Sequence, residues 1–191
     1  RSDGNTGAVE PFLRMGFALD EAEILTATTA DLRRPPRYAP DVEVIELHSE
    51  QQWSSAERAL TNAFASKRSG TLGDLRDFVV RQCARYRAMQ ARGLGQWYGA
   101  VVRGEIAAAL GIVRDRELGR FQLVDTDPKF GRRGVCSTLV HEAARRALAE
   151  GSIETLVMAA DAHYHAARVY ESVGFRCTER LRALLRKPPL A

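Results

Sequence analysis

A turn rich in glycine and arginine, FGRRGVCS at residues 130–137, holds the groups best suited to chemistry. From Val135 to Leu148 apolar residues recur every three or four positions, which predicts a helix that begins at this turn. The first N–H groups of a helix have no intrahelical partner and lie at the positive end of its dipole. Because the two glycines admit a bulky anion and Arg132 and Arg133 add charge, we interpret the turn as a phosphate or pyrophosphate cradle. The alternative is an ordinary solvated turn whose arginines face water.

Two apolar segments on either side of this helix must position the turn. FQLVDT at 121–126 is short and rich in strand formers, and TLVMAA at 155–160 is apolar throughout, as expected for a strand covered on both faces. Gly151 is expected to end the helix between them as a left-handed cap. Strand, helix and strand of these lengths predict a right-handed parallel crossover.

The remaining elements complete a mixed α/β domain. Periodicity predicts a strand over 41–47, a helix over 50–66 capped by Ser49, and a second helix from Leu75 to Gly93. A hairpin over 96–102 and 106–113 precedes the crossover, and a helix and a strand over 176–185 follow it. We therefore predict a central mixed sheet flanked by helices, with a short N-terminal appendage.

Composition excludes several classes of protein. The chain has 191 residues, of which 45% are hydrophobic and 27% charged, so it can bury a sizeable core. No apolar run approaches the ~20 residues of a membrane span, and the opening RSDGNTGAVE lacks the apolar segment of a signal peptide. The three cysteines are widely spaced and form no metal-binding pattern, so we expect a cytoplasmic protein without a metal. A net charge of +4 permits an anionic ligand but does not require nucleic acid.

Two motifs together resemble one family. GRRGVCSTLV after a strand, followed about 35 residues later by HAARVYESVGF, resembles the GNAT superfamily of N-acetyltransferases. Gly134 matches the first glycine of the family's turn, and Tyr170 stands four residues before the matching Gly-Phe pair. Two positions depart: Gly131 stands where the family usually has Arg or Gln, and Cys136 where it has Gly or Ala. The resemblance covers roughly residues 42–185.

The resemblance implies a GNAT-like fold and an acetyl-CoA-dependent acyltransferase. The cosubstrate pyrophosphate would bind the turn, and the pantetheine arm would pair with the strand edge at 123–125, opposite 158–160. The implied contacts with the cosubstrate are Leu123, Val124, Asp125, Arg132, Arg133, Gly134, Val135, Cys136, Ser137, His163, Ala166 and Tyr170. The acetyl group would pass by direct attack to an amine of a small molecule or a protein, which the sequence does not identify. A homodimer is a candidate assembly.

Five side chains are candidates for proton transfer or attack. Tyr170 corresponds to the general acid of many relatives, or packs in the core. Asp125 is our candidate for the base, whereas Asp127 precedes a proline and could merely shape the turn. His163 stands where relatives often have an Asn and could shuttle a proton, or could cap the last helix. Cys136, at a helix N-terminus, should have a lowered pKa, but its position favours packing over attack.

Two other functions compete with catalysis. An acyl-CoA-binding module without turnover, acting as a sensor or a partner subunit, would use the same cradle. Nucleic-acid binding would use RCTERLRALLRK at 176–187, which alternates like a strand and is more simply a solvated edge. We therefore expect acetyl-CoA and an amine acceptor as partners, with neither a membrane nor a nucleic acid.

The first 40 residues form a separate unit in our interpretation, with the acetyltransferase domain at 41–191. Phe12 stands four residues before Gly16-Phe17, as Tyr170 does before its own Gly-Phe pair, and a strand-like run at 22–28 follows. Since tandem GNAT proteins exist, the extension is either a remnant of a second GNAT-like unit or a coincidence over six residues. The paired prolines of 32–40 predict an irregular linker. We expect the apolar extension to dock its strand onto the main sheet.

Overall fold

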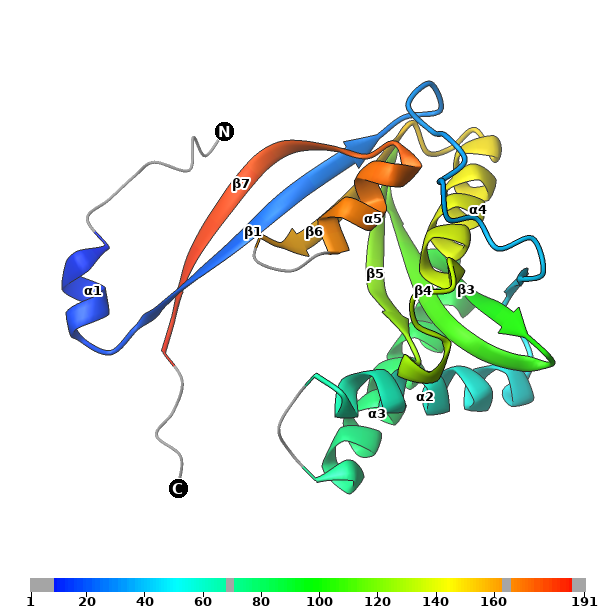
Figure 1. Ribbon diagram of the computed structural model, residues 1–191, viewed down its shortest axis with the longest axis horizontal. Helices are drawn as coiled ribbons and strands as arrows, with labels where there is room; N and C mark the ends of the chain where they lie inside the picture. The colour runs from blue at the N-terminus through cyan, green and yellow to red at the C-terminus, as the bar shows by residue number, and fades with distance from the viewer. Residues whose placement is uncertain (1–8, 68–70, 163–165, 187–191) are drawn as a thin grey trace.

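The protein forms one twisted seven-stranded sheet over the residues described by the computed structural model, 9–67, 71–162 and 166–186. The strand order is β2-β3-β4-β5-β6-β1-β7 (Figure 1). The strands are β1 (Ala18–Ala27), β2 (Glu43–Glu46), β3 (Gly95–Val102), β4 (Glu105–Asp115), β5 (Leu118–Thr126), β6 (Thr155–Asp161) and β7 (Arg176–Leu185). The helices are α1 (Glu10–Arg14), α2 (Glu50–Ala65), α3 (Leu72–Ala91), α4 (Val135–Ala149) and α5 (Ala166–Val173), with a 3₁₀ turn, η1, at Pro128–Phe130. The expected mixed α/β class is confirmed.

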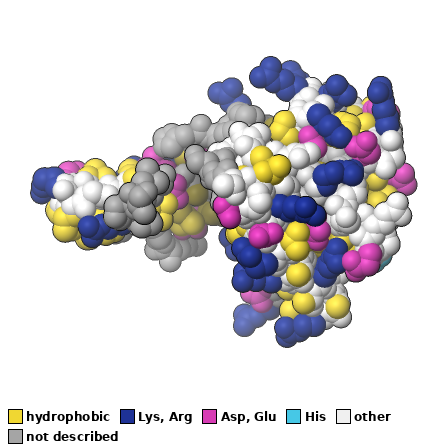
Figure 2. Space-filling view, turned by 90° about the horizontal axis from the view of Figure 1, so that it is seen from below, with side chains coloured by type: hydrophobic (Ala, Val, Ile, Leu, Met, Phe, Trp, Pro, Cys, Tyr) yellow, Lys and Arg dark blue, Asp and Glu magenta, His cyan; other side chains and the backbone are white. Residues whose placement is uncertain are grey.

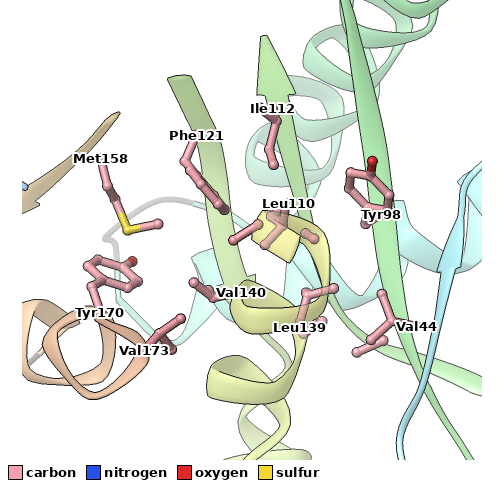
Figure 3. Close-up of a cluster of buried hydrophobic side chains, with 14 of the residues drawn as sticks. Val44, Tyr98, Leu110, Ile112, Phe121, Leu139, Val140, Met158, Tyr170 and Val173 are labelled. Carbon is pink, nitrogen blue, oxygen red and sulfur yellow. The ribbon is translucent and has the colours of Figure 1, made fainter. Parts of the chain in front are cut away.

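The helices cover the two faces of the sheet. Helix α4 packs on β2 to β6 and α5 on β6 and β1, while α2 packs on β4 and β5 and α3 on β3 (Figure 1). Each face has its own apolar core, one under α4 and α5 and the other under α2 and α3. Figure 3 shows part of the first core, with Leu139 and Val140 of α4 packed against the sheet.

Local sequence signals explain where the helices begin and end. The side chain of Ser49 accepts a hydrogen bond from the backbone N–H of Gln52, and the backbone N–H of Ser49 donates to Gln52 Oε1, so α2 begins with a capping box. Gly151, just beyond α4, has a φ of +75°, the left-handed conformation expected of a helix-ending glycine. None of the described helices is long and apolar enough to cross a membrane.

Strands β5 and β6 diverge, and this divergence opens the sheet. They pair in parallel only from Leu118 to Arg120, against residues 155–157. Beyond that point Leu123 has a φ of +47°, and the register with β4 shifts so that one extra residue of β5 is accommodated. Such a bulge bends the strand that carries it. The backbone edge of β5 after Arg120 is therefore turned away from β6.

The expectation that β6 is covered on both faces is wrong. Ala159 and Asp161 are exposed, while Leu156 and Met158 are buried on the side of α4 and α5. Helices α2 and α3 lie over β3 to β5, so they do not cover the second face of β6.

The N-terminal extension enters the sheet, as expected of its apolar residues. Strand β1 lies between β6 and β7 and is antiparallel to both. It begins at Ala18, four residues earlier than the strand-like run in the sequence suggested. The segment 32–40 is irregular, as its prolines predicted, but it packs along α4 instead of spanning open solvent.

Candidate functional site

A cavity of about 370 Å³ opens beside the end of β5, at the N-terminal end of α4. Its walls come from the linker, the end of α2, β5, the turn before α4, α4 and α5. The residues that line it are Arg37, Ser66, Lys67, Val124, Asp125, Thr126, Pro128, Phe130, Gly131, Arg132, Gly134, Val135, Cys136, Ser137, Ala166, Val169 and Tyr170. The predicted turn, strand edge and tyrosine therefore meet at one place.

The start of α4 offers this cavity a positive end of a helix dipole. Gly134 is the N-cap, with a φ of +78° and no side-chain cap, and the first helical hydrogen bond runs from the Thr138 N–H to the Gly134 carbonyl. The N–H groups of residues 135–137 precede that bond, so they have no partner within the helix. Arg132 has a φ of +61° and lines the cavity just before them. Left-handed residues in such a turn direct successive N–H groups toward one anion.

The linker forms part of this wall, which the sequence did not indicate. The Ser137 hydroxyl donates to the Arg37 carbonyl oxygen at 2.6 Å, and the Ala39 N–H donates to Thr138 Oγ1 at 2.8 Å. Both bonds hold residues 37–39 against the first turn of α4. Arg37 is thereby brought to the cavity as a further positive charge.

The two aspartates near the end of β5 have different surroundings. Asp127 is buried, accepts hydrogen bonds from the Lys129 N–H at 3.0 Å and from Asn62 at 2.7 Å, and so shapes the 3₁₀ turn. Asp125 instead lines the cavity and forms an ion pair with Lys67 through its Oδ1. Its side chain is 11% exposed. Asp125 is therefore the carboxylate that can meet a ligand.

Tyr170 lies where the cavity meets the core. It is 6% exposed and belongs to the apolar cluster under α4 and α5, in which Figure 3 shows it beside Met158 and Val173. It is also part of the cavity wall. The two sequence interpretations of Tyr170, core residue and site residue, thus describe one position.

A larger hollow of about 560 Å³ lies elsewhere, near the far end of α4. It is lined by residues such as Glu46, Arg87 and Glu150 and does not include the α4 N-terminus. Charges of both signs surround it, and Arg87 is already paired with Glu50 at 2.7 Å and with Glu57 at 3.3 Å. We therefore place the candidate site at the smaller cavity.

Comparison with known proteins identifies the fold. Residues 97–183 match the family model described as FR47-like protein. A functionally unknown conserved protein from Staphylococcus epidermidis is similar, with a TM-score of 0.72 and 13% identity over 95% of this chain and 69% of its own. A GCN5-related N-acetyltransferase from Kribbella flavida has a TM-score of 0.63 and 14% identity over 94% of this chain and 63% of its own. The chain has the GNAT fold.

A third similar structure, a GNAT family acetyltransferase from Brucella melitensis, is in complex with acetyl-CoA. It has a TM-score of 0.50 and 13% identity over 66% of this chain and 80% of its own. The chain spans less than two thirds of the Kribbella flavida protein. No curated protein sequence matches it. The GNAT fold that the two motifs led us to expect is confirmed.

The GNAT cavity gathers most of the residues expected to contact the cosubstrate. Those in its wall are Val124, Asp125, Arg132, Gly134, Val135, Cys136, Ser137, Ala166 and Tyr170. Leu123 instead turns toward the α2–α3 side, where it packs against the second core. Arg133 is exposed and does not line the cavity. His163 lies outside the described residues. The roles of these residues stay predictions.

The expectation of a lowered pKa for Cys136 is wrong. Burial raises the pKa of its thiol to about 11, which outweighs the lowering effects of the Thr126 hydroxyl and the Lys67 ammonium group. A thiol with this pKa is almost wholly protonated near neutral pH. Packing, the role that the sequence favoured, agrees with this environment.

Three polar residues of this wall were missed by sequence reasoning. Arg37 and Lys67 come from segments that are distant from the α4 turn in the sequence, and Ser66 is the C-cap of α2. None has a periodic or motif signal. Their only local sign is position, since a loop after a helix and a linker with arginines both commonly reach functional surfaces.

Proposed function

We propose that this chain is an acetyl-CoA-dependent N-acetyltransferase that transfers an acetyl group to an amine of a small molecule or a protein. The carrying observation is the cavity that the end of β5, the N-terminus of α4 and α5 enclose, where α4 begins without a side-chain cap. The GNAT fold and the acetyl-CoA complex of the Brucella melitensis protein support the choice of cosubstrate.

The chain's own groups fit an extended, anionic cosubstrate. The N–H groups at the start of α4 and the side chains of Arg37 and Arg132 would hold the diphosphate. The turned edge of β5 at Val124 and Asp125 leaves backbone groups for the amide-rich arm, as in the addition of a strand. Bound acetyl-CoA supplies an acyl group activated as a thioester.

Our candidate to receive the proton of the acceptor amine is Asp125. It is the carboxylate in the described wall, and its present partner is the ammonium group of Lys67. An acceptor amine that enters as an ammonium ion carries the same charge as Lys67 Nζ. We infer that Asp125 first binds this charge and then takes the proton, because only the neutral amine is a nucleophile.

Tyr170 is the candidate proton donor to the departing thiolate. Tyr170 belongs both to a wall of the cavity and to the core that contains Met158. A phenol and a thiol have unperturbed pKa values of roughly 10 and 8.5, which are close enough for this transfer. Direct attack without an acyl-enzyme agrees with the raised pKa of Cys136.

The test combines binding with turnover. Calorimetric titration with acetyl-CoA and with CoA should give saturable binding, and a thiol-release assay over a panel of small amines and peptides should then find an acceptor. Binding without thiol release from any acceptor would favour the acyl-CoA-binding module. Failure of both ligands to bind the folded chain would overturn the proposal.

A further inference from the structure

The first and last elements of the described chain are two copies of one structural unit. In α1 the N–H of Gly16 donates to the Leu13 carbonyl and that of Phe17 to the Phe12 carbonyl, both at 3.0 Å. After α5 the N–H of Gly174 donates to the Glu171 carbonyl at 3.0 Å and that of Phe175 to the Tyr170 carbonyl at 3.2 Å. Both glycines have positive φ, +82° and +118°. Each Gly-Phe pair is followed at once by a ten-residue strand, β1 or β7. The sequence repeat is therefore also a repeat of backbone structure.

The two strands pair with each other as a two-fold rotation would pair them. Ala22 lies opposite Leu181, and Glu23 lies opposite Arg180. When the two copies are aligned on their Gly-Phe pairs, residue 22 is equivalent to residue 180 and residue 23 to residue 181. A two-fold rotation about an axis between these residues therefore exchanges the two strands and keeps their pairing. A single register shift near Ile24 is the departure from this symmetry. The β1–β7 ribbon is thus pseudo-symmetric.

The surroundings of this ribbon are not symmetric. Residues 22–27 of β1 pair along their outer edge with β6, but β7 ends the sheet, and no described strand pairs with the outer edge of residues 180–185. Leu181 and Leu185 on that strand are 40% and 48% exposed. A long open edge presents unpaired backbone N–H and C=O groups, which form a template for pairing with another strand. The two-fold rotation places a second β6-like strand there.

Helix α1 lacks the cover that α5 has. Tyr170 and Val173 of α5 are 6% and 0% exposed because α4 and the sheet enclose them. Their equivalents, Phe12 of α1 and Met15 at its C-cap, are 42% and 54% exposed, and no residue of α1 is buried. Figure 1 shows the ribbon extending from the body of the protein with α1 at its tip. Figure 2 shows hydrophobic side chains on the same projecting arm.

A second copy of this chain does not fit the open edge. In such a copy the β6 edge that β7 needs is already paired with that copy's own β1. The partner of β7 must therefore be a unit in which the edge of the β6-like strand is not already paired with that unit's own last strand. Strand β1 is that missing last strand, because it follows α1 exactly as β7 follows α5.

We propose that α1 and β1 are the end of a second GNAT-fold unit that immediately precedes α1 in the same polypeptide. The two units exchange their last strands: β1 lies in the sheet described here, and β7 completes the sheet of the preceding unit. An α4-like helix of that unit covers Phe12 and Met15. This inference rests on the ribbon and the fold, so it stands even if acetyl-CoA does not bind.

The test compares the polypeptide expressed from its native reading frame, including all sequence before residue 9, with the 191-residue chain. Intact mass should show a native polypeptide far larger than 21.2 kDa. Hydrogen exchange of α1 and of residues 180–185 should be at least about tenfold slower in the native polypeptide, whereas the β3–β4 hairpin should exchange equally in both. The preceding GNAT-fold unit should slow the exchange of both segments, because it contacts both α1 and β7.

A matched pair of variants separates docking from a general effect of added charge. Met15→Glu should lower the Tm of the native polypeptide by about 3 °C or more, while Leu72→Glu, at a residue 62% exposed on α3, should leave it nearly unchanged. In the 191-residue chain both should have little effect. A native polypeptide of 21.2 kDa, or equal exchange in the two proteins, would overturn the proposal. So would concentration-dependent dimerisation of the 191-residue chain that protects β7, since a second copy would then be the partner.

Discussion

The carbonyl oxygen of Arg37 lies only 2.5 Å from where a Cβ on Gly134 would stand. Gly134 also has a φ of +78°, which side chains disfavour. The close approach of the linker and the left-handed backbone conformation therefore already require glycine at position 134. This requirement does not depend on room for a phosphate. A substitution at Gly134 disturbs the fold before it obstructs a ligand.

Gly134→Ala should therefore destabilise the protein by about 2 kcal/mol, from strain in the left-handed region and displacement of the linker. Gly131→Ala is the matched control, because Gly131 has a φ of −60° and its nearest neighbour to an added Cβ is the Pro128 oxygen at 3.2 Å. Thermal denaturation of both variants measures the difference. Equal melting temperatures would contradict this account of Gly134.

Two adjacent arginines allow a sharper test of the cosubstrate site. Arg132 lines the cavity and Arg133 does not. Arg132→Ala should weaken acetyl-CoA binding by roughly tenfold or more, as expected for one charge-assisted hydrogen bond, while Arg133→Ala should change it by less than about twofold. Calorimetry gives both affinities. A larger loss in Arg133→Ala would move the phosphate site away from the cavity.

Tyr170→Phe removes one hydroxyl and keeps the ring packed. With an acceptor in hand, kcat should fall by roughly 10²-fold while acetyl-CoA affinity stays nearly constant, because a general acid acts in the chemical step. Tyr98→Phe is the control: its buried hydroxyl donates to Gln96 at 2.6 Å, so it should lose about 1 kcal/mol of stability and no turnover. Full activity in Tyr170→Phe would leave Tyr170 as a core residue alone.

Removal of residues 1–40 should give an insoluble or unfolded protein. The deletion takes out β1, which lies between β6 and β7, and it also removes the linker bonds to Ser137 and Thr138. Exposed edges on both remaining strands favour aggregation. Solubility after expression and the melting temperature are the measurements. A soluble truncated domain that melts at the temperature of the whole chain would show that β1 contributes nothing to stability.

The cysteines should differ in reactivity toward iodoacetamide. Burial raises the pKa of Cys136 to about 11 and that of Cys83 to about 12, so both hold little thiolate at pH 8, whereas Cys177 is exposed. Peptide mass spectrometry should find Cys177 modified first. Between pH 7 and 9 the rate at Cys136 should rise about tenfold per pH unit without a plateau. Rapid modification of Cys136 at pH 7 would restore it as a candidate nucleophile.

Local patterns in the sequence determined the elements around the site. The apolar stripe from Val135 predicted α4, and the Gly-Arg turn before it predicted an N-terminus that faces a ligand, because both depend on residues close together in the chain. Tyr170, four residues before its Gly-Phe pair, was found in the same way. The structure brings these parts to one cavity.

Contacts between distant segments were decided only by the tertiary structure. The sequence could not show that the Arg37 carbonyl lies close to Gly134, that Lys67 pairs with Asp125, or that β1 lies between β6 and β7. The pKa of Cys136 was misjudged for the same reason: its position at a helix start is a local feature, but its burial depends on every element packed around it. The periodicity of a sequence indicates which face of a helix or strand is buried. The interaction partners of a side chain, the order of the strands and the desolvation of a group depend on how the whole chain folds.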